Sequence, residues 1–239
     1  MNRRLILYTQ ISYDRYNQGV KEKIPWWTFS VFNYGERMNI MNFKRALLVI
    51  KREINLTEDE RNLVDVLNKE YEPWIKSLTK KEIHAIRKYT KNSLDDNTKD
   101  KFYLRLNKML RGDYNKNTRD YEKLCEYADI ISKSIKKHAI EEDIICYRGT
   151  SQIPVSDYPI GLPFYYNQFI STSLFEKHAF KKKYKMVLYI KKGTKAAYIN
   201  KISAYKSQYE VLLDKDCLYT LKSIKGNTYE LEVCDNGNN

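Results

Sequence analysis

The sequence Ser203-Ala204-Tyr205-Lys206-Ser207-Gln208-Tyr209-Glu210-Val211-Leu212-Leu213 predicts a turn that leads into a buried strand. Its apolar end is typical of a strand inside a sheet. Side chains two apart on a strand point to the same face, so we expect the Gln208 amide and the Glu210 carboxylate to project together. An isolated pair of this kind is usually the solvated face of an ordinary strand. The rest of the chain has to decide between the two interpretations.

The segment upstream of this strand is predicted to be helical. Apolar residues recur at three- and four-residue steps over residues 40–138, the pattern of helices that bury one face. Thr57 with Glu60, and Thr79 with Glu82, have the spacing of capping boxes. Two of the helices should therefore begin at these threonines.

The order of helices and strands indicates the fold class. Over residues 144–233 the pattern changes to short β-rich runs separated by proline and glycine. We predict an α+β fold, with an N-terminal helical lobe followed by a mixed or antiparallel β-sandwich core. Residues 1–50 are expected to be an appendage of unclear role. Residues 51–239 are expected to be a single domain, helical over 51–140 and β-rich over 141–239.

The composition restricts the kind of partner. The chain has 239 residues, of which 42% are hydrophobic and 13% aromatic, so it should be globular and not disordered. Forty-three Lys and Arg residues against 30 Asp and Glu residues give a formal net charge of +13. Such a charge favours nucleic acid, an anionic membrane surface, a phosphate-bearing ligand or an acidic protein. The charge alone does not distinguish these partners.

Neither metal binding nor membrane insertion is indicated. The four cysteines form no C-x-x-C pair and have no histidine at ligand spacing, so we expect no zinc site. No apolar run approaches the ~20 residues of a membrane span. The run Leu5-Ile6-Leu7, after two arginines, is too short for a signal peptide. We expect either that the chain is not exported by that route or that a leader is missing from it.

Three polar motifs interrupt the β-rich half of the chain. They are Tyr147-Arg148-Gly149, Ser171-Thr172-Ser173 and Gln208-Tyr209-Glu210. In this order they resemble the Arg…Ser-Thr-Ser…(Gln/Glu)-x-Glu signature of bacterial toxin mono-ADP-ribosyltransferases. Nucleotide-binding glycine loops, H-E-x-x-H and kinase motifs are absent from the sequence, and none of the three histidines is expected to be a catalytic base.

Three further segments strengthen this resemblance. Trp74-x-x-x-Leu78-Thr79-x-x-Glu82 is similar to the helical lobe of the family, and Leu106–Arg111 is similar to its L/I-N-x-x-L-R helix. Residues 192–205 are similar to the strand and loop before the catalytic glutamate. The resemblance covers roughly residue 50 to the C-terminus. It is closest to the clostridial-type exoenzymes that modify Rho GTPases.

The resemblance implies a catalytic role for Glu210. Breaking the nicotinamide–ribose bond of NAD develops positive charge on the ribose carbon, as in glycoside hydrolysis. A fixed carboxylate stabilises that charge more in the transition state than in the ground state. Glu210 would supply this carboxylate and bind a ribose hydroxyl, and Ser171 would orient it. Gly149 and Ser173, from the other motifs, would contribute to NAD binding.

The resemblance also implies which residues bind NAD. Arg148 would pair with a phosphate of NAD through its planar guanidinium. Asn107 and Arg111 would hold the ADP end, and Phe180 would lie beside nicotinamide. Lys183 stands where relatives carry a phosphate-binding arginine. The sequence departs from the family pattern at this position, because lysine lacks the planar fork.

The residue at position 208 bears on the acceptor. A carboxylate there would attract a guanidinium, whereas the neutral amide of Gln208 offers one donor and one acceptor that complement another amide. We therefore expect transfer to an asparagine of a Rho-type GTPase, with Tyr205 touching the protein substrate. The resemblance further implies a monomeric bacterial toxin that is secreted and acts in the host cytosol, with NAD as substrate and no metal.

Two alternatives remain open at this point. A guanine base edge also complements an amide, DNA-modifying relatives carry glutamine before the catalytic glutamate, and the net charge favours phosphate. The second alternative is a non-enzymatic module that has kept the fold. Its binding surface should centre on Trp26, Trp27 and Tyr205.

Overall fold

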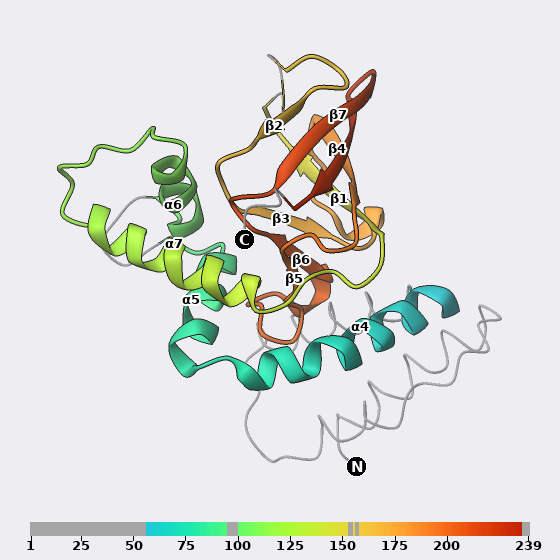
Figure 1. The fold of residues 1–239 in the computed structure, drawn as a ribbon, viewed down its shortest axis with the longest axis horizontal. Coiled ribbons are helices and arrows are strands. Elements are labelled where there is room, and N and C mark those ends of the chain that lie inside the picture. The colour runs from blue at the N-terminus through green and yellow to red at the C-terminus, as the bar shows by residue number, and fades with distance from the viewer. Residues whose placement is uncertain (1–55, 95–99, 153–154, 156–157, 236–239) are drawn as a thin grey trace, which may run out of the picture. The chain divides into compact units, whose positions relative to one another are not determined.

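The computed structural model describes residues 56–94, 100–152, 155 and 158–235 (Figure 1). These residues all fall within one compact unit. The expected appendage over residues 1–50, with Trp26 and Trp27, lies outside the described residues, as does the first predicted helical stretch over residues 40–54.

Four α-helices make up the described part of the helical lobe, and two of them begin where the sequence predicts. Thr57 and Thr79 each accept a hydrogen bond from the backbone N–H of the glutamate three residues on, and that glutamate accepts one in return, so both capping boxes are present. Gly112, with φ of +82°, follows the end of the third helix. The helices are α4 (Glu58–Ser77), α5 (Lys80–Thr90), α6 (Phe102–Leu110) and α7 (Tyr121–Lys136).

The second half of the domain is an eight-stranded mixed sheet. Its strand order is β2-β7-β8-β4-β1-β3-β6-β5. All neighbouring pairs are antiparallel except β4 and β8, which are parallel. The α+β class and the mixed sheet are thus confirmed. The strands are β1 (Ile144–Thr150), β2 (Pro163–Tyr165), β3 (Ile170–Ser173), β4 (Tyr184–Ile190), β5 (Ala196–Tyr198), β6 (Glu210–Leu213), β7 (Leu218–Lys225) and β8 (Thr228–Cys234).

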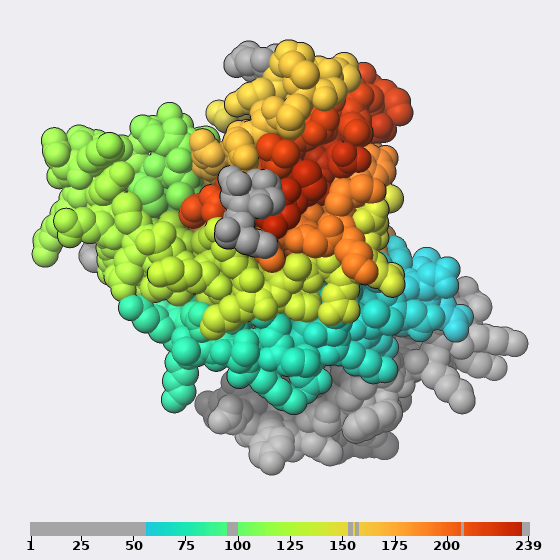
Figure 2. Space-filling view, in the orientation of Figure 1, coloured from blue at the N-terminus to red at the C-terminus, as the bar shows by residue number. Residues whose placement is uncertain are grey.

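The helices pack against the end of the sheet formed by β5 and β6 (Figure 1). Helices α4 and α7 both contact β5. The Tyr71 hydroxyl donates to the Ala196 carbonyl at 3.4 Å, and the Trp74 indole donates to the Ser134 carbonyl at 2.9 Å. The first of these hydrogen bonds joins α4 to the sheet and the second joins α4 to α7, so the polar groups of both aromatic side chains have partners. In Figure 2 the helical part and the strands form adjoining areas of one surface.

The three polar motifs meet because the strands that carry them are neighbours in the sheet. Arg148 lies on β1, Ser171 on β3 and Glu210 at the start of β6, and these strands are adjacent in the order β1-β3-β6. Ser173 is directly opposite Glu210 in the antiparallel pair. Ser171 is therefore a diagonal neighbour of Glu210 on the same face. No described helix is both long and apolar enough to cross a bilayer.

Candidate active site

Glu210 is a buried carboxylate held by two serine hydroxyls. Its side chain is 2% exposed. Ser171 donates to Oε1 at 2.5 Å, and Ser203 donates to Oε2 at 2.8 Å. Each carboxylate oxygen thus has its own donor, which fixes the rotamer of the side chain.

The surroundings of Glu210 affect its charge in opposite directions. Burial, the largest cause, raises the pKa of Glu210, because the ionised form loses hydration. The hydroxyls of Ser171 and Ser203 and the positive charge of Arg148 offset part of this rise, and the pKa of Glu210 stays above its ordinary value. A carboxylate that is poorly hydrated but still ionised interacts strongly with any positive charge that develops beside it.

Arg148 is joined to the same strands. Its Nη1 donates to the carbonyl oxygen of Ser171 at 2.6 Å. This hydrogen bond uses one of the five N–H donors of the guanidinium. The remaining donors can take part in a charge-assisted contact with a phosphate. The structure therefore brings together Arg148, Ser171 and Glu210, three of the four residues on which the sequence prediction depends; Gln208 is the fourth.

Gln208 and Glu210 are not related as the sequence analysis expected. Gln208 ends the 3-10 helix η2 (Lys206–Gln208), and β6 begins only at Glu210. Tyr209 between them is left-handed, with φ of 48° and ψ of 52°. The prediction that strand alternation aligns the two side chains is wrong, because the chain reverses at Tyr209 before the strand starts.

Packing holds Tyr209 in this backbone conformation. A left-handed conformation costs a non-glycine residue about 1–2 kcal/mol. The ring of Tyr209 is buried and packs edge-to-face on Phe175 at 5.2 Å and on His178 at 4.9 Å. Its carbonyl oxygen accepts from the N–H of Leu174 at 3.0 Å. These contacts offset the cost, and they separate the loop that carries Gln208 from the strand that carries Glu210.

Ser173 holds the end of the same loop. Its hydroxyl donates to the carbonyl oxygen of Gln208 at 2.7 Å. Ser173 is buried, and its hydroxyl also lies 3.1 Å from the carbonyl oxygen of Phe175. The sequence analysis placed Ser173 among the residues that bind NAD, whereas the structure shows it fixing the backbone of Gln208.

Ser203 is a further residue of the site, and the sequence analysis did not single it out as one. It is 3% exposed, and its hydroxyl contacts both Glu210 and the loop. The Tyr205 N–H donates to Ser203 Oγ at 3.2 Å. Nothing in the spacing points to this role, because Ser203 stands outside the three motifs and seven residues before Glu210.

Gly149 permits a close approach between two segments. A β-carbon at this position would lie 1.7 Å from the carbonyl oxygen of Phe180. No side chain larger than hydrogen fits there. The ring of Phe180 itself is 59% exposed. Gly149 thus sets the position of the segment that presents Phe180, beside a surface cavity of about 510 Å³ lined by both residues.

Lys183 and Tyr205 both lie at the surface near these segments. The Lys183 ammonium is 5.1 Å from the centre of the Tyr184 ring. The Tyr205 side chain is 39% exposed, and its hydroxyl accepts from the N–H of Asn92 at 3.3 Å.

Asn107 and Arg111 of the α6 region have protein partners. The Asn107 amide donates to the Tyr89 hydroxyl at 3.1 Å and to the Phe169 carbonyl at 3.2 Å, and it accepts from the Phe169 N–H at 3.3 Å. Arg111 donates to the side chains of Gln168 and Asp113. Asn107 is only 6% exposed. It therefore anchors the start of β3, whereas the more exposed Arg111 remains accessible.

This geometry defines the class of protein. A buried carboxylate clamped by two hydroxyls, beside an arginine, suits the stabilisation of positive charge on the sugar of a phosphate-bearing substrate. The model of the ADP-ribosyltransferase exoenzyme family matches residues 67–238. The chain belongs to this family, which is one of mono-ADP-ribosyltransferase toxins.

One curated relative is similar in sequence to part of this chain. The NAD(+)–arginine ADP-ribosyltransferase EFV of Enterococcus faecalis is 28% identical over 168 residues, which cover 66% of this chain and 32% of the relative. The chain thus spans about a third of the length of that protein.

Solved structures share the fold. The Plx2a toxin of Paenibacillus larvae matches with a TM-score of 0.59 and 24% identity, covering 73% of this chain and 96% of that one. The Clostridium limosum C3 exoenzyme matches with a TM-score of 0.54 and 22% identity over 72% and 93%. The ADP-ribosylating toxin BECa of C. perfringens, solved with NADH, has a TM-score of 0.54 and 27% identity over 71% and 46%.

Proposed function

We propose that this protein transfers ADP-ribose from NAD to an asparagine side chain of a Rho-type small GTPase. Family membership and the site around Glu210 support the transfer. The neutral amide of Gln208 is the observation that favours asparagine as the acceptor. The protein would act as a secreted toxin in the cytosol of a host cell, as the family resemblance implies.

The proposed reaction breaks one bond and forms one. The glycosidic C–N bond of NAD breaks, and its electron pair leaves with nicotinamide. The ionised Glu210 stabilises the positive charge on the ribose carbon. The side-chain nitrogen of the acceptor then forms a bond to this carbon and loses a proton. Arg148 would hold a phosphate of NAD during both steps.

Gln208 would select the acceptor by hydrogen bonding. Its amide can donate to and accept from the amide of an asparagine, but it carries no charge to attract a guanidinium. Ser173 fixes its backbone through the hydrogen bond to the Gln208 carbonyl. Tyr205, exposed at the beginning of the same loop, would contact the protein surface around the acceptor.

Arginine is the second candidate acceptor. It is favoured by the name of the curated relative, an NAD(+)–arginine ADP-ribosyltransferase. The relative is 28% identical, and this chain covers only 32% of it. We give more weight to Gln208, because arginine recognition benefits from a carboxylate at that position.

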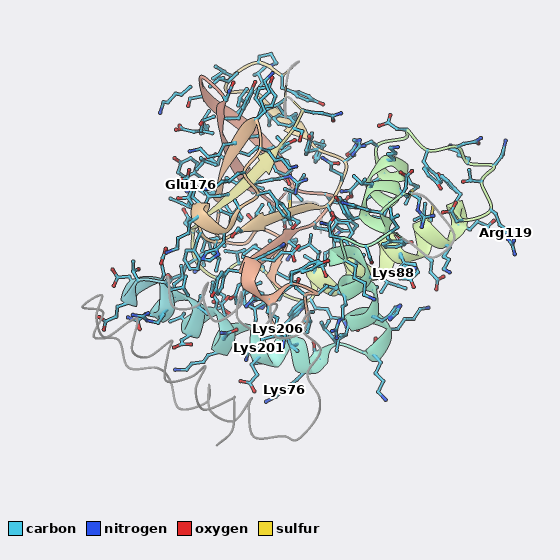
Figure 3. All side chains as sticks on the ribbon, turned by 180° about the vertical axis from the view of Figure 1, so that it is seen from behind. Lys76, Lys88, Arg119, Glu176, Lys201 and Lys206 are labelled. Carbon is cyan, nitrogen blue, oxygen red and sulfur yellow. The ribbon has the colours of Figure 1, made fainter. Side chains whose placement is uncertain are left out.

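The basic side chains of the described residues do not single out nucleic acid as the acceptor. Basic side chains such as Lys76 on α4, Lys88 on α5, Arg119 before α7 and Lys206 on η2 come from separate elements (Figure 3). Recognition of a phosphate backbone usually relies on a basic stripe along one face.

The test uses labelled NAD with a host-cell lysate, treated or not treated with nuclease, and with a purified Rho-type GTPase. We expect one labelled protein of small-GTPase size and, by mass spectrometry, ADP-ribose on an asparagine. Label that disappears with nuclease would favour the guanine alternative. Label on arginine, or transfer to the arginine analogue agmatine, would show that the acceptor is arginine and not asparagine. Absence of NAD cleavage would favour the non-enzymatic binding module.

A matched variant checks the role of Gln208. Gln208→Glu differs from the native side chain only in charge and in one donor group. We expect it to keep NAD cleavage, because Glu210 and its serines are unchanged, but to lose most transfer to asparagine. Unchanged transfer to asparagine in this variant would contradict the assignment of acceptor choice to Gln208.

A further inference from the structure

A second cluster of ligand-type side chains lies away from Glu210. It consists of Glu70 on α4 and of His138 and Glu141, which follow α7. One ligand atom of each residue lies within 4.8 Å of the others. His138 Nε2 is 3.3 Å from Glu70 Oε1. Sequence spacing could not reveal this cluster, because Glu70 and His138 are 68 residues apart.

The imidazole is held in place before any ligand binds. The ring of His138 packs edge-to-face on Tyr71, with centroids 4.4 Å apart and planes at 80°. The backbone N–H of His138 donates to the carbonyl oxygen of Ile135 at 3.2 Å, which holds the backbone of this residue. Only 18% of the His138 side chain and 17% of the Glu70 side chain are exposed. Two of the three ligands are thus fixed, and Glu141, which is exposed, can adjust to complete the set.

The cluster combines one imidazole with two carboxylates. Four lysines line the adjoining cavity, namely Lys136, Lys137, Lys192 and Lys195. Two of them pair with other carboxylates: Lys137 is 2.6 Å from Glu82, and Lys136 is 2.6 Å from Asp216.

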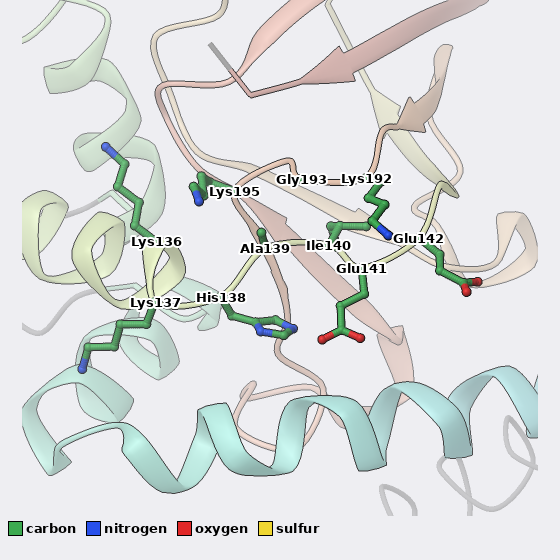
Figure 4. Close-up of a pocket in the computed structure, with 10 residues that line it drawn as sticks. All are labelled: Lys136, Lys137, His138, Ala139, Ile140, Glu141, Glu142, Lys192, Gly193 and Lys195. Carbon is green, nitrogen blue, oxygen red and sulfur yellow. The ribbon is translucent and has the colours of Figure 1, made fainter. Parts of the chain in front are cut away.

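Figure 4 shows the same arrangement from the adjoining cavity. His138 and Glu141 point towards helix α4, while Lys136 and Lys137 point away from them. Both His138 and Glu141 line this cavity, which has a volume of about 590 Å³. The cavity gives an ion access to the cluster and leaves room for a water ligand.

We propose that Glu70, His138 and Glu141 bind one divalent transition-metal ion, with Zn²⁺ as the best fit. Imidazole nitrogen and carboxylate oxygen are ligands of Zn²⁺, at bond lengths of about 2.0–2.2 Å. Two such ligands at a tetrahedral angle are about 3.3–3.5 Å apart, close to the 3.3 Å between Glu70 and His138. Ca²⁺ and Mg²⁺ prefer oxygen ligands alone.

The ion would have a structural role. It would connect helix α4 to the segment that joins α7 to β1, and so link the helical lobe to the sheet. The proposed transfer reaction uses Glu210 and no metal, so the ion should change stability and leave NAD cleavage unchanged. This separates a failure of the metal proposal from a failure of the proposed function.

The experiment is a zinc titration of tag-free protein that has first been treated with a chelator. Calorimetry should show one bound ion per chain. At a hundredfold excess over the dissociation constant, the melting temperature should rise by about 5–10 °C. His138→Gln and Glu141→Gln should each weaken binding at least tenfold. Glu141→Gln alters an exposed residue, so it tests the proposal even if the histidine variant folds poorly.

Two controls exclude other sites. Glu142→Gln and His84→Gln alter neighbouring or similar residues outside the cluster and should bind zinc like the native protein. Cobalt bound to the protein should show no thiolate charge-transfer absorption, which excludes the cysteines. Absence of binding, binding that Glu141→Gln leaves unchanged, or a cobalt–thiolate signal would each overturn the proposal.

Discussion

Replacing Ser203 by alanine tests whether the second hydroxyl sets the charge of Glu210. The change removes the donor that lies 2.8 Å from Glu210 Oε2 and leaves the Ser171 contact to Oε1 intact. It also removes the acceptor for the Tyr205 N–H. Ser203 and Glu210 are both buried, so water poorly replaces the lost hydrogen-bond donor of Glu210.

The size of the effect follows from the hydrogen bond. A bond to a charged group contributes about 1.5–3 kcal/mol, and one pH unit corresponds to about 1.4 kcal/mol. The Ser203 hydroxyl lowers the pKa of Glu210, so its loss raises that pKa. Because the ionised form is the one that stabilises positive charge, the acid limb of the rate profile should move upward by about 1–2 pH units.

The assay is nicotinamide release from NAD between pH 5 and 9 (about two units on either side of neutrality), recorded for the native protein and the variant. Ser132→Ala is a matched control. Ser132 is also buried and donates to a buried carboxylate, Asp214, at 2.9 Å. The control should lose comparable stability without moving the rate profile.

Two results would refute this reasoning. If Ser203→Ala lowered the rate equally at every pH, the hydroxyl would act on the loop and not on the charge of Glu210. If Ser132→Ala moved the rate profile as much, the shift would be a general consequence of lost stability.

Three further variants test the structure around the site. Gly149→Ala places a β-carbon against the Phe180 carbonyl oxygen. We expect the free energy of unfolding to fall by about 1–3 kcal/mol and the KM for NAD to rise. An unchanged KM would contradict the view that the close approach at Gly149 positions Phe180 for NAD binding. Asn107→Leu should lower the free energy of unfolding by about 2–4 kcal/mol, because the Tyr89 hydroxyl and the backbone of Phe169 lose their hydrogen-bond partner. A higher KM for NAD at unchanged stability would instead indicate that Asn107 contacts NAD directly. Burial raises the pKa of Glu210 above its unfolded value, so stability is lost as the pH rises from the unfolded pKa to the folded one, and the loss is complete above the folded pKa. Glu210→Gln should melt higher than the native protein at pH 8 (about one unit above neutral), with the difference vanishing in acid, and an equal or lower melting temperature would show that the charge is well solvated.

Local patterns were enough to predict the helices and most strands. Capping boxes and apolar periodicity identify α4 and α5, because these signals reside in neighbouring residues. Strand β2 was not predicted, since Pro163–Tyr165 is too short to show alternation. Its place at the edge of the sheet follows only from pairing with β7, which is remote in the sequence.

The site was predictable where family motifs mark it and not where folding alone creates it. Arg148, Ser171 and Glu210 come together as expected. Ser203 carries no local signal, because its role depends on the reversal of the chain before β6. The same reversal, at the left-handed Tyr209, made the alternation argument for Gln208 fail, since packing of a buried ring overrode the preference of the backbone.

The most direct test of the account is the rate of NAD cleavage by Glu210→Gln. The amide keeps the size of the side chain and can still bond to the serines, but it carries no charge. We expect nicotinamide release and ADP-ribose transfer to fall by about 10²–10³-fold, the usual cost of removing one electrostatic contact from a transition state, with the fold retained. A rate within tenfold of the native protein would show that the buried carboxylate of Glu210 does not stabilise the reacting ribose.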